Sequence, residues 1–172
     1  MDHDELATGL EALHPAGYGW AMSCCGWKRE DAEDVLQLSY MRILSGEARF
    51  DGRANFKTFV FAVIRRTAAE QRRRSWVRQV ALARWWDQRP APHPPLDPET
   101  RAHDREMNRR LVAALQQLPA RQRDVLHLVF YQDLTVEEAA RVLDVSVGTA
   151  RTHFDRGKKR LRQMFDAVEV QR

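Results

Sequence analysis

The stretch LTVEEAARVLDVSVGTARTHFDRGKKRL, Leu134–Leu161, predicts two short helices joined by a tight turn. Thr135 can cap the first helix, and Glu138 three residues later completes a capping box. The expected turn is Asp144–Val145, and Ser146 can cap the second helix. Two short helices joined in this way indicate a helix-turn-helix, whose second helix enters the major groove of DNA.

Helical spacing divides the second helix into an apolar face and a basic face. Residues 147–162 hold six bases against one acid, so the outer face is strongly basic. The inner face is predicted to carry Val147, Ala150, Phe154, Gly157 and Leu161. Side chains on the outer face can reach base edges. The candidate DNA-binding residues there are Thr149, Arg151, Thr152, His153, Asp155, Arg156 and Lys159.

Asp155 is unexpected on a helix face that meets phosphates, and two roles for it stay open. It can orient Arg151 or Arg156 through an ion pair, which we favour, or accept a hydrogen bond from the N4 amine of cytosine. An exposed i,i+4 pair without such a role contributes only a few tenths of a kcal/mol. Arginine bridges the O6 and N7 atoms of guanine, so Arg156 is expected to read a base.

A proline-rich segment divides the chain into two parts. Residues 87–98 read DQRPAPHPPLDP and hold five of the seven prolines, which favours an extended linker over helix or sheet. Neither part shows the alternation typical of strands. The sequence therefore predicts an all-α chain of two small helical domains, 1–80 and 104–172, joined by a linker at 81–103.

The N-terminal domain is predicted to contain two amphipathic helices. The first, DAEDVLQLSYMRIL at 31–44, is acidic at its start. The second begins after Asn55, a candidate N-cap. Its apolar stripe is predicted to be Phe56, Phe59, Val60, Val63, Ile64 and Thr67. Its outer face is predicted to be Lys57, Thr58, Phe61, Arg65, Arg66, Ala69, Arg72 and Arg73.

Charge is distributed unevenly along the chain. Residues 1–51 carry ten acids against four bases, whereas residues 65–89 carry eight arginines against two acids. The second basic block is the outer face of the helix-turn-helix. Two separated basic blocks indicate two contacts with a polyanion, and the acidic front fits a basic protein surface.

Four quoted stretches together resemble the extracytoplasmic-function (ECF) sigma factors of the sigma-70 family. They are DAEDVLQLSYMRIL, FDGRANFKTFVFAVIRRTAAEQRRR, LPARQRDVLHLVFYQDLTVEEAARVL and DVSVGTARTHFDRGKKRLRQMF. The resemblance covers about residues 5–167 and includes the order of the blocks and the linker. It implies that 1–80 is sigma region 2, that 104–172 is sigma region 4, and that the chain directs promoter-specific transcription.

The resemblance also implies roles for particular residues. The 31–44 helix would bind the clamp of the polymerase through Asp31, Asp34, Gln37, Leu38 and Met41. The second block would read the −10 promoter element through Arg53, Asn55, Lys57, Phe61, Arg65, Arg66, Arg72 and Arg73. In this block the loop 50–55 is a candidate pocket for a flipped base. The helix after Ser146 would read the −35 element through the outer-face residues given above.

Expected partners are core RNA polymerase, promoter DNA and an anti-sigma factor. The chain ends soon after Phe165, so no C-terminal regulatory domain or cysteine-rich tail is expected. The acidic amino terminus is unlike a signal peptide and no apolar run reaches membrane-spanning length, which predicts a cytoplasmic protein. A stand-alone helix-turn-helix regulator is the alternative, but it leaves the acidic helix and the 56–74 block unexplained.

Catalytic, cofactor and metal sites are not expected. The sequence has no glycine-rich phosphate loop and no H-E-x-x-H motif, so an enzyme is not predicted. Cys24 and Cys25 are adjacent, and with His3 and His14 they fit no common zinc spacing. We interpret both cysteines as small apolar residues on a helix. The sequence leaves open the promoter consensus, the inducing signal and any sensing role of these thiols.

Overall fold

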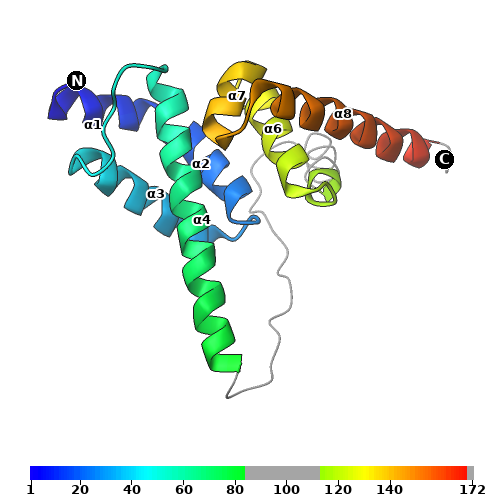
Figure 1. Cartoon of the computed structure of the whole chain (residues 1–172), viewed down its shortest axis with the longest axis horizontal. Coiled ribbons are helices and arrows are strands. Elements are labelled where there is room, and N and C mark those ends of the chain that lie inside the picture. The colour runs from blue at the N-terminus through cyan, green and yellow to red at the C-terminus, as the bar shows by residue number, and fades with distance from the viewer. Residues whose placement is uncertain (84–112, 170–172) are drawn as a thin grey trace, which may run out of the picture. The chain divides into compact units, whose positions relative to one another are not determined.

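The computed structural model describes residues 1–83 and 113–169, and within them every regular element is a helix (Figure 1). The chain divides into two compact units, residues 1–95 and 96–172. The predicted all-α fold is therefore confirmed. The proline-rich segment 87–98 lies outside the described residues. Of the predicted linker only the first three residues are described, and they form the end of helix α4.

The first unit contains α1 (His3–Ala12), α2 (His14–Cys24), α3 (Arg29–Leu44) and α4 (Phe56–Ala83). Asp2 caps α1 through a capping box with Glu5. Helices α2, α3 and α4 all pack against one another, and α4 runs on past the other two (Figure 1). The long α4 is thereby held firmly at its N-terminal half.

The core of the first unit forms around Trp20 of α2, which is fully buried. Its indole N–H donates to the carbonyl oxygen of Phe61 at 3.0 Å, and the two rings stack with centroids 6.3 Å apart. Apolar residues of α3 and α4 complete this core: Ala32, Val35, Leu36, Ile43, Val60, Val63, Ile64 and Ala68.

The prediction that Phe61 and Thr58 lie on the outer face of α4 is wrong, because both are buried. Their burial has a simple cause: α4 is contacted by α2 as well as by α3, so its buried face is wider than one apolar stripe. Phe56 and Phe59, predicted for the core, are only half-buried and pack with Phe50.

An arginine of α3 joins that helix to α4 through an ion pair. The Arg42 side chain is 14% exposed and its guanidinium lies 2.7 Å from the Glu70 carboxylate. The same guanidinium donates to the Thr67 hydroxyl at 3.1 Å and lies 3.3 Å from Glu47. Because breaking a partly buried pair leaves a charge unpaired, loss of either Arg42 or Glu70 is expected to destabilise the contact between α3 and α4.

The second unit contains α6 (Ala120–Phe130), α7 (Val136–Leu143) and α8 (Val147–Glu169). The predicted capping box of α7 is confirmed, since Glu138 N–H donates to Thr135 Oγ1 at 3.1 Å and Glu138 Oε2 accepts from Thr135 N–H at 2.8 Å. Thr149 N–H donates to Ser146 Oγ at 3.1 Å, which confirms the cap of α8. Asp144 ends α7 in the left-handed conformation, with φ +53°.

Small residues allow α8 to cross the other two helices closely. Ala150 is fully buried, and a Cβ at Gly157 would lie 2.8 Å from Leu126 Cδ1. Phe154 packs against the buried cluster of this unit, which consists of Leu115, Leu118 and Leu126. The prediction that Val147 faces inward is wrong: its position in the first turn of α8, beyond the crossing, leaves it 37% exposed.

Candidate nucleic-acid interface and polymerase-binding face

The outer face of α8 carries the predicted DNA-binding residues. Six of these seven side chains are exposed, and His153 is half-buried. The Thr152 hydroxyl donates to the Gly148 carbonyl at 2.9 Å, and the Thr149 and Ser146 hydroxyls lie 2.8 Å apart. Both threonine hydroxyls therefore already have partners within this unit, and apolar contact of a threonine methyl with a thymine methyl is the base contact that such a side chain can still make.

Ion pairs on this face differ from the favoured prediction for Asp155. Arg151 Nη2 lies 2.7 Å from Glu137 Oε1 of α7, and Asp155 lies 4.0 Å from Lys158. Asp155 therefore orients neither arginine in this structure. The hydrogen bond from Arg151 lowers the pKa of the Glu137 carboxyl below its ordinary value. Glu137, fourteen residues before Arg151 and not connected to it by helical spacing, is therefore the ion-pair partner of Arg151.

The outer face of α4 forms a second basic surface. Arg66, Arg72 and Arg73 are exposed, and Arg65 is half-buried. Lys57 is half-buried, with Nζ 5.7 Å from the centroid of the Phe61 ring. Phe61 lies beneath this surface and does not belong to it.

The loop before α4 places polar groups at the end of this surface. Asn55 Oδ1 accepts from Thr58 N–H at 2.7 Å, which confirms Asn55 as the N-cap of α4. Arg53 Nε lies 3.2 Å from Asp51, and both side chains are exposed. Phe50, at the start of this loop, clusters with Phe56 and Phe59 of α4, with ring centroids 5.3–6.2 Å apart. Polar side chains of the loop can bond the edge of an unpaired nucleobase, and the aromatic rings beside them can contact its face.

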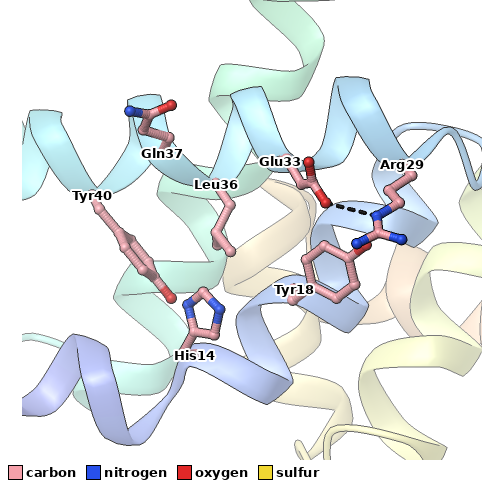
Figure 2. Close-up of a pocket in the computed structure, with 7 residues that line it drawn as sticks. All are labelled: His14, Tyr18, Arg29, Glu33, Leu36, Gln37 and Tyr40. Carbon is pink, nitrogen blue, oxygen red and sulfur yellow. Dashed lines mark hydrogen bonds and ion pairs between the residues drawn. The ribbon is translucent and has the colours of Figure 1, made fainter.

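The exposed face of α3 carries the predicted polymerase-binding residues. Asp31, Asp34, Gln37 and Met41 are exposed, whereas Leu38 is half-buried. A groove of about 540 Å³ between α2 and α3 borders this face (Figure 2). It is lined by His14, Tyr18, Arg29, Glu33, Leu36, Gln37 and Tyr40.

Contacts within the groove fix its two ends. Arg29 Nε donates to Glu33 Oε1 at 2.8 Å at one end (Figure 2). The His14 and Tyr40 rings meet edge to face at the other end, with centroids 6.0 Å apart. Burial raises the pKa of the Tyr40 phenol.

The two cysteines lie at the C-terminal end of α2. Cys24 is buried, and Cys25 is half-buried with the pKa of its thiol raised to about 11, chiefly by burial and also by Asp31. A thiol with so high a pKa is a poor nucleophile at neutral pH. Within residues 1–83 and 113–169 no cluster of side chains is arranged to hold a metal ion. In the same residues no helix has the length and apolar character of a membrane span.

Together these features define a helical DNA-binding protein with a helix-turn-helix unit and a second basic helical unit. Known families match both units: Sigma-70 region 2 matches residues 10–78, and Sigma-70 region 4 matches residues 108–161. The ECF RNA polymerase sigma factor SigX of Bacillus subtilis is 33% identical over 142 residues, 81% of this chain and 73% of SigX. The ECF sigma factor SigE of Mycolicibacterium smegmatis is 30% identical over 135 residues, 78% of this chain and 51% of SigE.

Solved structures share the fold. The sigma factor RpoE of Bartonella quintana, determined with the anti-sigma factor NepR, superposes with a TM-score of 0.72 at 23% identity. This match covers 94% of this chain and 97% of RpoE. CnrH, determined with the cytosolic domain of CnrY, has a TM-score of 0.63 at 21% identity and covers 96% of this chain and 95% of its own.

The chain belongs to the ECF sigma factors. It is accordingly a transcription initiation factor that binds core RNA polymerase and directs promoter-specific initiation. A stand-alone helix-turn-helix regulator is not favoured, because the first unit matches sigma region 2 over residues 10–78.

Proposed function

We propose that each of the two units recognises a different element of the promoter. Residues 1–80 act as region 2, which binds the polymerase clamp and the −10 element, and residues 104–172 act as region 4, which binds the −35 element. Residues 81–103 tether the two, so that each weak DNA contact raises the effective concentration of the other. The observation that carries this proposal is the exposed basic face of α8, in a capped helix-turn-helix.

The −10 contact is assigned to Arg53, Asn55 and Lys57 near the loop and to Arg65, Arg66, Arg72 and Arg73 along α4. Charged side chains follow the phosphates of the melted strand, while the loop over the aromatic cluster receives a base. The buried Phe61 is left out of this contact.

The clamp contact is assigned to Asp31, Asp34, Gln37, Leu38 and Met41 of α3. We expect Asp34→Arg to weaken binding to core polymerase about tenfold or more, because it places a like charge against a basic surface. Fluorescence anisotropy of the labelled full chain with core polymerase measures the change. Glu11→Arg, an exposed reversal on α1, is the matched control and should bind as the parent does. Equal losses in the two variants would count against this face.

Base reading in the −35 element is assigned first to Arg156. Its side chain is exposed, and no ion pair holds it among the residues that the structure describes. We expect Arg156→Ala to cost about 1–3 kcal/mol at one base position and to relax the preference there. Selection from a randomised promoter library with the holoenzyme measures this change.

Lys159 offers the matched control for Arg156, since it is exposed on the same helix. Lys159→Ala should weaken binding evenly across sequences, as the loss of a phosphate contact does. An unchanged upstream consensus for Arg156→Ala would show that Arg156 reads no base.

Control by an anti-sigma factor is also part of the proposal. NepR and CnrY bind the structural relatives RpoE and CnrH, and the exposed α3 face with its neighbouring groove offers an inhibitor a surface on this chain. We place the protein in the cytoplasm with its DNA, and assign it no catalytic activity of its own. Affinity purification from cells tests the inhibitor: activity that follows only the amount of this chain, with no bound partner, would argue against it.

A further inference from the structure

A tryptophan is exposed at the centre of the basic face of α4. Ala62, Ala69 and Trp76 are spaced seven residues apart, so they lie nearly in line along the helix. The Trp76 side chain is 65% exposed, the largest exposed fraction among the big apolar side chains described. Arg72 and Arg73 are four and three residues before it, so both lie one turn away on either side of that line.

Charge on this face is almost uncompensated. Glu70 is the one acid in the sequence of α4, and its carboxylate is bound by Arg42 at 2.7 Å. Within the described residues no ion pair neutralises Arg66, Arg72 or Arg73 on this face. A large flat aromatic surface between unpaired arginines matches the two needs of single-stranded DNA, a stacking face for a base and cations for its phosphates.

We propose that Trp76 is a stacking site for one unpaired base of promoter DNA, with Arg72 and Arg73 on the adjoining phosphates. This inference rests on the proposed role of α4 in binding the −10 region, and it adds a base contact to that role. At 1.5 Å per residue, Trp76 lies about 30 Å along α4 from Phe56. The base on Trp76 is therefore a different one from the base expected at the Asn55 loop.

The test uses the full chain and a fluorescein-labelled thymidine oligonucleotide at low salt, followed by anisotropy. We expect Trp76→Ala to weaken binding about 5- to 150-fold, the usual range for one stacked base, and Trp76→Phe to keep most of the affinity. The salt dependence of Trp76→Ala should stay parallel to that of the parent. Arg73→Ala should instead flatten the slope by roughly 0.7. Because Trp76 is exposed, circular dichroism should show an unchanged fold.

Duplex DNA of the same length separates stacking from general attraction. Trp76→Ala should lose much less affinity for the duplex, whose bases are already stacked. Equal losses on both DNAs, no binding by the parent chain, or equal binding by the parent and Trp76→Ala would each overturn the inference. A loss of core polymerase binding with unchanged DNA binding would also overturn it, because Trp76 would then contact protein.

Run-off transcription distinguishes this inference from the proposed function. If the parent chain starts transcription with core polymerase and Trp76→Ala binds single strands as the parent does, only the stacking site is contradicted. If the parent chain starts no transcription, the proposed function itself fails.

Discussion

Replacing Trp20 with alanine is expected to lower the free energy of unfolding of the first unit by about 3–5 kcal/mol. The side chain is fully buried and stacks on Phe61, and its indole N–H bonds the Phe61 carbonyl oxygen at 3.0 Å. The substitution opens a cavity where α2 meets α4. The proposed polymerase-binding face of α3 and the basic face of α4 both belong to this unit, so both should be destabilised. Urea unfolding of the full chain, followed by circular dichroism, measures the loss.

Trp20→Phe separates packing from the hydrogen bond. Phenylalanine keeps most of the buried apolar surface but has no N–H donor, so its cost should be clearly smaller than that of alanine. Trp76→Ala serves as the exposed control and should leave stability nearly unchanged. A cost below about 1 kcal/mol for Trp20→Ala would mean that this side chain is not central to the core.

Acidification is expected to destabilise the second unit through His127. The His127 side chain is 4% exposed, its Nε2 lies 3.2 Å from Gln132 Nε2, and its ring stacks on Tyr131. Burial first, and Arg123 second, lower the pKa of His127 from 6.5 to about 4. The folded state thus favours the neutral ring, while the unfolded chain takes up a proton below pH 6.5.

Stability from this histidine is fully present above about pH 6.5 and is lost as the pH falls toward 4. Between pH 7.5 and 5 the loss should be about 2 kcal/mol, and about 3 kcal/mol over the whole window. No tryptophan follows residue 86, so tryptophan fluorescence does not report the second unit and serves as an internal control for circular dichroism of the chain. His127→Gln should remove most of this pH dependence. An unchanged pH profile in that variant would contradict the role of His127.

Local signals predicted the second unit well because its caps and turn are local in sequence. Thr135 bonds Glu138 and Ser146 bonds Thr149, so each expected hydrogen bond joins residues three apart. Asp144 adopts the left-handed conformation that aspartate tolerates at a helix end. Such contacts depend little on tertiary packing, so the sequence was enough to predict them.

Features that depend on packing between helices were predicted poorly. A single apolar stripe predicts contact with one neighbouring helix and places Phe61 on the outer face, whereas α4 contacts both α2 and α3 and Phe61 is buried. The ion pair of Glu137 with Arg151 joins residues fourteen apart, and only the crossing of α7 and α8 brings them together. The spacing of Trp76 from Arg72 can be read from the sequence. The exposure of Trp76 cannot, because it depends on which helices cover α4.

Run-off transcription with the purified chain, core RNA polymerase and a pool of genomic promoter fragments tests directly whether the chain acts as a sigma factor. We expect discrete transcripts that require both the chain and the core enzyme. Their promoters should share two elements at a constant spacing, and Arg156→Ala should alter the upstream one alone. If the chain binds DNA but neither binds core polymerase nor supports any transcript, the account of a sigma factor is contradicted.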